Sequence, residues 1–254
     1  MSKPIVPWIG GKRRLAKFIL PLFPEHQTYV EPFCGAAALF FMKDPAKAEV
    51  INDVNGELMN LYRIVKHHLE PLIEEFRWGL VGRQQFEWFQ KQPIDQLTDI
   101  QRAARFFYLQ KLCFGGRVQS RNYGVDVCRP PRLNYLRVGD DLAEAHARLS
   151  AVTIEHLPWD TCVSRYDRST TLFYCDPPYW ETEGYGVDFG IEQYHQLAAA
   201  AKTIAGKMII SVNDHPEMRK VFDGLRVETT ELKYTVGGQK ANSGKSRELV
   251  IFNW

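Results

Sequence analysis

Short apolar segments alternate with helix-forming segments at both ends of this 254-residue chain. The helical segments carry apolar residues at helical spacing, whereas the strand-like ones are short, β-prone and bounded by turn residues. The strand-like segments are residues 28–33, 49–52, 171–175 and 207–212, and the helical ones are residues 36–42, 58–65 and 191–204. This alternation predicts an α/β fold with a Rossmann-like, mostly parallel sheet.

Two parts of the chain depart from this alternation. Residues 227–235 and 248–252 are β-prone runs around a loop rich in glycine and basic residues, which predicts an antiparallel hairpin at the edge of the sheet. In the middle of the chain, a helical pattern over residues 100–112 precedes an arginine-rich stretch. We expect residues 1–57 and 150–254 to form the sheet domain and residues 58–149 to form an inserted, mainly helical subdomain.

Composition excludes several classes of protein. Hydrophobic residues make up 45% of the chain and charged residues 24%, as in an ordinary globular domain. No run is long enough for a membrane span, and Lys12, Arg13 and Arg14 interrupt the segment where a signal peptide would be apolar, so we expect a cytoplasmic protein. The five cysteines form no C-x-x-C pair and have no histidine at zinc spacing, which predicts reduced thiols and no metal site.

The sequence Asp176, Pro177, Pro178, Tyr179 directly follows the strand-like segment that ends at Cys175. Ligands bind at the carboxyl ends of parallel strands. An aromatic amine is a poor nucleophile, because its lone pair is delocalised into the ring. The Asp176 carboxylate and a backbone carbonyl fixed by the prolines could accept both amino hydrogens, while Tyr179 stacks on the base. The alternative, a proline turn with a core tyrosine, is disfavoured by this position.

A second motif places Phe33 and Gly35 in a turn of small residues between a strand and a helix, where a nucleotide-like cofactor could approach the backbone. Asp53 ends the next strand, where Rossmann-like sheets place a carboxylate for ribose hydroxyls. Taken alone, Asp53 is equally compatible with a helix N-cap or turn beside Asn55.

Near the start, Trp8, Gly10, Gly11 and Lys12 combine a close turn with an aromatic face and a cation. The pattern is not a phosphate-binding P-loop, because Val6 stands where that motif needs glycine and Arg13 where it needs serine or threonine. ATP hydrolysis is therefore disfavoured.

In this order the three motifs resemble the DNA adenine methyltransferases of the Dam type, over nearly the whole chain. The resemblance implies a methyltransferase sheet that binds S-adenosylmethionine, with Asp176 as the motif aspartate. It also implies cofactor contacts, and the expected cofactor-binding residues are Trp8, Gly10, Gly11, Lys12, Phe33, Gly35, Asp53, Asp160 and Asp176. The chain departs from the family at Ala37, where glycine is frequent, and at Gly115, where asparagine is usual.

Net charge is only +2, but residues 113–137 contain five arginines and a single acid. This basic segment has the residue types that contact phosphates and base edges, which predicts that the inserted subdomain recognises the DNA target. Solvated surface arginines are the alternative. The expected DNA-binding residues are Arg117, Arg121, Asn122, Arg129 and Arg132, together with Lys240 and Lys245 of the final hairpin.

We therefore predict methyl transfer from S-adenosylmethionine to the N6 amino group of an adenine flipped out of double-stranded DNA. Asp176, Pro177, Pro178 and Tyr179 are the expected catalytic residues. Methylation of the cytosine N4 amino group or of RNA, or a catalytically silent DNA-binding relative, are the alternatives. We expect a monomer, and the sequence is compatible both with a solitary enzyme and with one paired with a restriction endonuclease.

Overall fold

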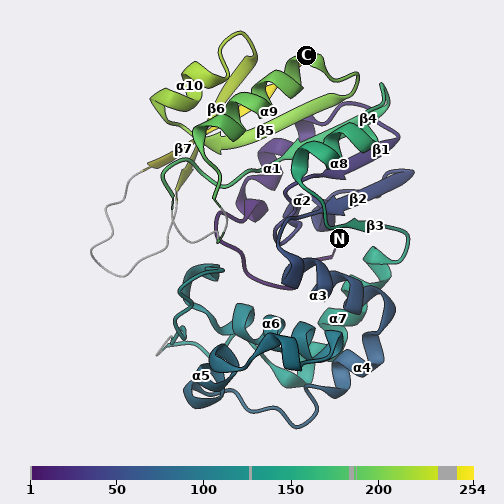
Figure 1. Cartoon of the computed structure of the whole chain (residues 1–254), viewed down its shortest axis with the longest axis vertical. Helices are drawn as coiled ribbons and strands as arrows, with labels where there is room; N and C mark the ends of the chain where they lie inside the picture. Colours follow the sequence, from purple (N-terminus) through teal and green to yellow (C-terminus); the bar gives the residue numbers. More distant parts are fainter. Residues whose placement is uncertain (1, 126–127, 183–185, 187, 234–244) are drawn as a thin grey trace.

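A seven-stranded sheet with the strand order β3-β2-β1-β4-β5-β7-β6 lies in the upper half of the molecule as drawn in Figure 1. The computed structural model describes residues 2–125, 128–182, 186, 188–233 and 245–254. The strands are β1 (Thr28–Glu31), β2 (Ala48–Asn52), β3 (Thr153–Glu155), β4 (Thr171–Cys175), β5 (Lys207–Asn213), β6 (Arg226–Lys233) and β7 (Lys245–Phe252). Strands β1 to β5 pair in parallel, and β7 runs antiparallel to both β5 and β6.

This topology confirms the expected α/β class, a mostly parallel sheet with an antiparallel C-terminal pair. The strand-like segments of the sequence begin and end within about two residues of the observed strands. Strand β3 was not expected, because it has three residues and lies half-exposed at the sheet edge beside β2. Short edge strands carry little hydrophobic pattern, so the sequence offered no signal for it.

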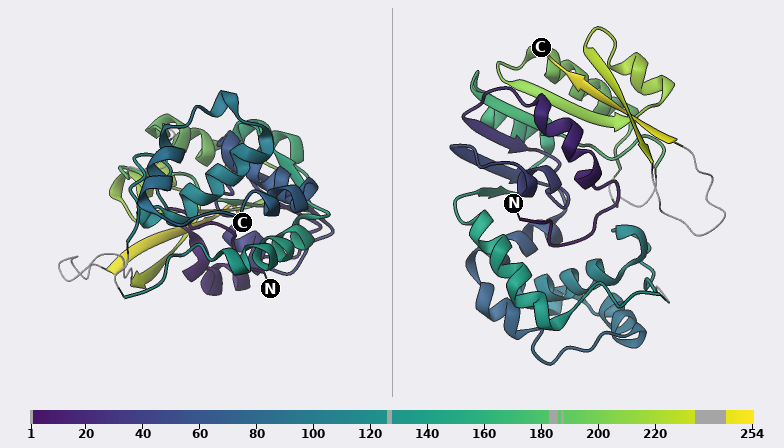
Figure 2. Two further views of the ribbon diagram at one scale, coloured as in Figure 1. Left: turned by 90° about the horizontal axis from the view of Figure 1, so that it is seen from below. Right: turned by 180° about the vertical axis from the view of Figure 1, so that it is seen from behind.

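Helices cover both faces of the sheet. Along β1, Val30 packs with the helices of one face, while Tyr29 packs with those of the other, as the two-residue period of a strand requires. One face is covered by α8 (Trp159–Tyr166), α9 (Ile191–Thr203) and α10 (Pro216–Val221), and the other by α1 (Ala16–Ile19) and α2 (Ala38–Met42). Figure 2 shows these two layers from below and from behind.

The helices between β2 and β3 form one group, which lies below the sheet in Figure 1. Its helices are α3 (Gly56–His67), α4 (Leu69–Glu74), α5 (Arg83–Lys91), α6 (Asp99–Leu112) and α7 (Tyr135–Leu149). Helix α6 begins at a capping box, in which the Thr98 and Gln101 side chains exchange hydrogen bonds with each other's backbone amides. The apolar core of these helices is continuous with that of the sheet face covered by α1 and α2. Its role in target recognition stays a prediction.

Four short 3-10 segments complete the described structure: η1 (Lys12–Arg14), η2 (Leu20–Leu22), η3 (Ile94–Gln96) and η4 (Phe114–Gly116). All five cysteines carry free thiols, and all except Cys128 are buried, as expected. Across the described ranges, no helix is long and apolar enough to cross a membrane.

Candidate active site

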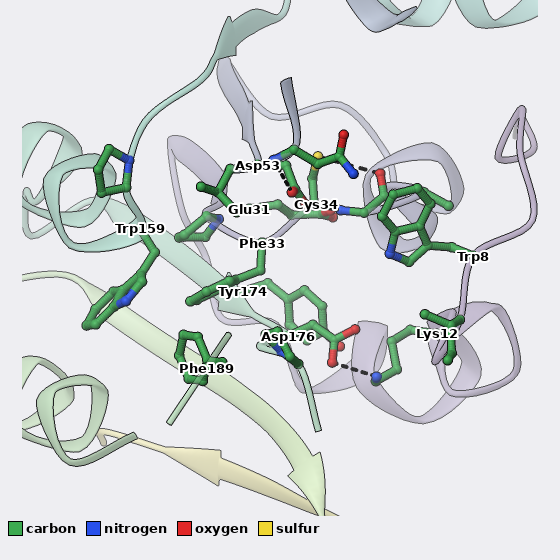
Figure 3. Close-up of a pocket in the computed structure, with 18 of the residues that line it drawn as sticks. Trp8, Lys12, Glu31, Phe33, Cys34, Asp53, Trp159, Tyr174, Asp176 and Phe189 are labelled. Atoms are coloured by element: carbon green, nitrogen blue, oxygen red, sulfur yellow. Dashed lines mark hydrogen bonds and ion pairs between the residues drawn. The ribbon is translucent and has the colours of Figure 1, made fainter. Parts of the chain in front are cut away.

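A cavity of about 290 Å³ opens at the carboxyl ends of β1, β2 and β4 (Figure 3). Aromatic and acidic side chains both contribute to its wall. The acidic residues at its wall are Glu31, Asp53, Asp160, Asp176 and Asp188, whereas Lys12 is its one lysine and no arginine lines it among the described residues. The cavity therefore presents an excess of negative charge to whatever it binds.

Asp176, the residue that follows β4, is held by two donors from different parts of the chain. Nζ of Lys12 lies 2.5 Å from its Oδ1 atom, and the Ser211 hydroxyl of β5 donates to the same oxygen at 3.0 Å. Burial raises the pKa of Asp176 to about 6, although Lys12 and Ser211 both act to lower it. The carboxyl group is thus costly to ionise and depends on its two donors to stay charged near neutral pH.

Lys12 is a cation buried at the wall of the cavity, with a side chain that is 3% exposed. It begins η1, and its ammonium group donates to the Gly10 carbonyl at 3.0 Å and lies 4.3 Å from the centroid of the Tyr179 ring. A buried ammonium group is tolerated only when it is paired and hydrogen-bonded, and these contacts with Asp176 and Gly10 provide both. The first and third sequence motifs therefore meet at one point.

Hydrogen bonds from α9 and β5 hold the turn formed by the D-P-P-Y motif. The Tyr194 hydroxyl of α9 donates to the Pro178 carbonyl, while the Asn213 amide binds both the N–H and the C=O of Trp180, at 3.0 and 3.2 Å. Within the described chain, no donor reaches the Pro177 carbonyl. The Pro177 carbonyl is therefore an acceptor that the described chain leaves unfilled, although Pro178, not Pro177, lines the cavity beside Asp176.

The turn of the second motif is packed against Trp8. Gly35 has a φ of +46°, and a Cβ atom placed on it would lie 2.7 Å from Nε1 of Trp8. Ala37 also adopts the left-handed conformation, with a φ of +51°, which explains why glycine is frequent at this position in the family that the sequence resembles. The same reason covers Gly115, whose φ of +71° suits glycine or asparagine.

Asp53 directly follows β2 and lines the cavity, but its carboxylate also has structural partners. Oδ2 accepts the N–H of Gly35, and Oδ1 accepts the N–H of Asn55, both at 2.9 Å. Asn55, not Asp53, is the N-cap of α3. Burial raises the pKa of Asp53, and the two amides act against this rise. The structure thus gives Asp53 a role in the turn and assigns the helix cap to Asn55, while a contact of Asp53 with ribose hydroxyls stays a prediction.

Trp159 and Phe189, two aromatic side chains that the sequence analysis did not select, form one end of the cavity with Phe33. Phe33 stacks on Trp159 with ring centroids 5.9 Å apart, and Phe189 meets Phe33 edge-on at 5.5 Å. The Trp159 indole N–H donates to Gln193 of α9 at 2.7 Å. Asp160 is exposed in the first turn of α8, beside this aromatic end. Tyr174 of β4 also lines the cavity.

Glu31 ends β1 with its side chain buried at the cavity wall. Its Oε1 atom accepts the Tyr29 hydroxyl at 2.7 Å and the Phe40 N–H at 2.8 Å. Burial raises the pKa of Glu31 to about 7, even though these hydrogen bonds lower it. The motif glutamate of the sequence is therefore a buried acid that titrates near neutrality, a property that the sequence alone could not reveal.

Asn52, the last residue of β2, joins three segments around the cavity. Its fully buried side-chain amide donates to the carbonyls of Pro32 and Leu157, at 2.8 and 3.0 Å, and accepts the Leu157 N–H at 2.8 Å. The Asn52 carbonyl accepts the Cys34 N–H. This one side chain ties the turn after β1 to the segment that leads into α8.

The expected DNA-binding residues are spread over the segment between α6 and α7. Four of them are exposed, namely Arg117, Asn122, Arg129 and Arg132. Arg121 is half-buried, where its guanidinium group donates to Gln110 at 3.2 Å and lies 5.1 Å from the Phe106 ring centroid. Lys240 lies outside the described residues, and Lys245 is the first residue of β7.

Basic side chains also gather around a second cavity, of about 400 Å³, between the N-terminal segment and the start of α7. Its cationic residues are Lys3, Arg13, Lys111, Arg132 and Arg137, and its acidic ones are Asp141 and Glu144. Lys111 is mostly buried there, with Asp141 at 4.0 Å as its ion-pair partner. Burial lowers the pKa of Lys111, as expected for a cation that lacks a close counter-ion.

Known proteins are similar to this sequence over nearly its full length. A family model described as D12 class N6 adenine-specific DNA methyltransferase matches residues 8–236. Type II methyltransferase M1.LlaDCHI of Lactococcus lactis subsp. cremoris is 28% identical, over 99% of this chain and 95% of that protein. DNA adenine methylase of Haemophilus influenzae is 27% identical, over 98% and 92%. A crystal structure of a protein described as a methyltransferase, complexed with SAH, covers 95% of this chain and 52% of its own, with a TM-score of 0.39 and 11% identity.

Proposed function

Because the chain belongs to the D12 class of N6 adenine-specific DNA methyltransferases, we propose that it binds S-adenosylmethionine in the 290 Å³ cavity and methylates a flipped-out adenine of double-stranded DNA there. This membership confirms the resemblance to Dam-type enzymes and the expected methylation of adenine. The alternatives of cytosine or RNA methylation and of a silent DNA-binding protein do not match the family.

The charge of the cavity is the observation that carries the proposed cofactor. Five carboxylates and one lysine line it, and that lysine is already paired with Asp176. S-adenosylmethionine carries a sulfonium and an ammonium group against one carboxylate, so it is a net cation and suits an acidic cavity. Nucleoside triphosphates are polyanions and would be repelled, which agrees with the lack of a P-loop.

Within this proposal, the two ends of the cavity hold different parts of the cofactor. Phe33 and Trp159 present ring faces that suit the purine, and Asp53 lies at a strand end that suits the ribose hydroxyls. Asp160 is close enough to the aromatic end to accept from the purine amino group. When bound, the cofactor supplies an electrophilic methyl group on its sulfonium. Trp8, Gly11, Gly35 and Lys12 line the cavity, and Gly10 lies behind them as a hydrogen-bond acceptor of Lys12.

The target adenine is proposed to lie over the D-P-P-Y turn. Asp176 and the Pro177 carbonyl accept the two hydrogens of the amino group, which draws its lone pair out of the ring and toward the methyl carbon. Tyr179 stacks on the flipped base. When bound, S-adenosylmethionine would supply the methyl group to this nitrogen, and Asp176 would accept the proton that the amino group loses.

Phosphates of the duplex are proposed to contact the exposed members of the arginine-rich segment and the basic cavity. Arg117, Asn122, Arg129 and Arg132 are accessible, whereas the contacts of Arg121 are internal, so that Arg121 supports the loop. Lys240 and Lys245 remain proposed backbone contacts on sequence grounds. We further propose that the protein acts as a monomer in the cytoplasm, with or without a cognate restriction endonuclease.

Two measurements test this function. In calorimetry, S-adenosylmethionine should bind with one site per chain, and ATP should show no binding under the same conditions. Incubation with S-adenosylmethionine and unmethylated genomic DNA, followed by mapping of modified bases, should reveal N6-methyladenine within one short sequence motif. Tight binding of ATP in the same cavity, or methylation confined to cytosine, would contradict the proposal.

A further inference from the structure

Both donors to Asp176 reach the same oxygen atom. Nζ of Lys12 and Oγ of Ser211 lie 2.5 and 3.0 Å from Oδ1. No donor within the described residues reaches Oδ2, and the Asp176 side chain keeps 20% of its surface exposed at the cavity (Figure 3). The two oxygens are therefore unequal: one is held by the protein, and the other is accessible from the cavity.

Ser211 is itself oriented by a second hydroxyl. The Tyr174 hydroxyl of β4 lies 2.7 Å from Oγ of Ser211, and both residues are buried. A serine hydroxyl has a single hydrogen, and in Ser211 that hydrogen goes to Asp176. The hydrogen between Tyr174 and Ser211 must then come from Tyr174. This fixes the direction of a relay from Tyr174 through Ser211 to Oδ1 of Asp176.

We propose that Lys12 and Ser211 are positioning residues that hold Oδ1 of Asp176, so that Oδ2 is the oxygen that accepts the amino hydrogen of the target base, and that Tyr174 orients Ser211 for this task. The inference rests on the proposed function. It assigns Lys12 a role toward the carboxylate in addition to any contact with the cofactor, and it gives Ser211 a role beyond its place in the sheet.

The charges around Asp176 explain why these donors matter. Lys12 is the cation beside it, and Glu248 of β7 is an acid that raises its pKa. Asp176 in turn raises the pKa of Glu31 of β1, and Tyr174 and Tyr194 are hydroxyl groups nearby. With Lys12 and Ser211 in place, the pKa of Asp176 is about 6. Loss of either donor moves it upward, toward the pH at which the enzyme works, and a protonated Asp176 binds the amino group less well.

Ser211→Ala and Tyr174→Phe test the relay, with Tyr108→Phe as the control. Tyr108 also loses a buried hydroxyl, but its partners Leu80 and Gly82 lie in the helical part. Ser211→Ala should lower kcat at neutral pH about tenfold and leave KM for DNA within about twofold. In the plot of kcat against pH, the limb on the acidic side should move to a pH higher by about one unit. Tyr174→Phe should shift the limb in the same direction by less, and Tyr108→Phe should not shift it.

Lys12→Gln separates the two roles of the lysine. If Lys12 holds the carboxylate, this variant shifts the acid limb upward; if it only binds cofactor, the variant weakens cofactor affinity with an unshifted limb. Carbon NMR of Asp176 without cofactor gives a second readout, which should show a raised pKa in both Lys12→Gln and Ser211→Ala. Unchanged Asp176 titration in both variants overturns the inference. If instead both variants show the raised pKa of Asp176 but the wild-type protein does not methylate DNA, the proposed function is wrong and the inference about the carboxylate stands.

Discussion

The indole of Trp8 fills the space in which a side chain on Gly35 would lie. A Cβ atom on Gly35 would come within 2.7 Å of Nε1 and 2.8 Å of Cδ1 of the indole. Gly116, in the helical part, approaches the Trp8 backbone just as closely, since its Cβ atom would lie 2.9 Å from the Trp8 nitrogen. Trp8 thus lies between the turn that contains Gly35 and the loop after α6. It leaves no space for a side chain at Gly35 or at Gly116.

Gly35→Ala should therefore damage the cofactor site. The new methyl group clashes with Trp8, and alanine strains at the φ of +46°. We expect a loss of roughly 2 kcal/mol in the free energy of unfolding and at least about tenfold weaker binding of S-adenosylmethionine. Urea unfolding and calorimetry measure these two quantities.

Gly82→Ala provides the matched control, because a Cβ atom on Gly82 meets nothing within 4 Å and its φ is extended. It should bind the cofactor as the wild type does. Cofactor binding at wild-type strength in Gly35→Ala would show that Trp8 can move away, and that its packing does not set the shape of the site.

Asn52 allows a test of the connection between the turn after β1 and the segment that leads into α8. Asn52→Asp keeps the shape of the side chain but replaces the donors to the Pro32 and Leu157 carbonyls with a carboxylate oxygen. A buried acceptor facing two acceptors should cost about 3 kcal/mol of unfolding free energy at neutral pH. Denaturant unfolding gives this value. A loss under about 1 kcal/mol would indicate that this connection rearranges.

The motifs and the strand–helix alternation sufficed to predict the sheet and the position of Asp176 after β4, whereas the ion pair between Lys12 and Asp176 was not predicted. Their information is local: a D-P-P-Y turn after an apolar run places the carboxylate at a strand end, whatever packs around it. Strand β3 escaped prediction, because three half-exposed residues leave no periodic pattern.

Residues that act through distant partners could not be found in this way. Asn52 lies 105 positions from Leu157, and the whole helical part lies between Phe33 and Trp159 in the sequence. Nor can a sequence show which oxygen of Asp176 is held, or that Arg121 turns inward to Gln110. Such roles depend on tertiary contacts, and the composition of the arginine-rich segment is the same whether its side chains face DNA or the core.

Glu31 should make the stability of the protein depend on pH. Its pKa is raised from 4.5 to about 7 by folding, so the folded state binds the proton more tightly. The associated stability is fully present below the unfolded value and is lost as pH rises through about 7. Glu31→Gln keeps an acceptor for Tyr29 and Phe40 but cannot ionise.

Relative to wild type, Glu31→Gln should therefore gain about 3 kcal/mol of unfolding free energy between pH values of roughly 4.5 and 8. Urea unfolding of both proteins without cofactor, at several pH values, measures this difference. If the two stability curves run parallel across that range, Glu31 is not the buried acid that the geometry indicates.

Asp176→Ala should abolish most of the activity. Without the carboxylate, one of the two acceptors for the amino hydrogens is lost, and kcat should fall by about 10³-fold. Methyl incorporation into a DNA duplex measures the rate, and circular dichroism checks the fold. Turnover at the wild-type level would mean that the Pro177 carbonyl alone suffices, and that the carboxylate acts elsewhere.

The basic cavity between the N-terminal segment and α7 predicts a phosphate contact. Lys3, Arg13 and Arg137 line it without an ion pair among the described residues, and Lys111 lies 4.0 Å from its one acid partner. Like charges gathered in this way repel one another unless an anion joins them. A phosphate of the DNA backbone would neutralise the group, with release of counter-ions.

Lys111→Met keeps an unbranched apolar stem but removes the ammonium group, which lies 5.1 Å from the Phe107 ring centroid. It should weaken binding of all DNA sequences alike and lower the slope of log affinity against log salt by about one unit. Lys202→Met, on α9, removes a lysine that donates to the Asp223 carbonyl, away from this cavity. It should leave the slope unchanged. Fluorescence anisotropy at several salt concentrations measures both. An equal slope in Lys111→Met and wild type would exclude a phosphate from this cavity, because a contact that releases no counter-ion is not a contact with the backbone.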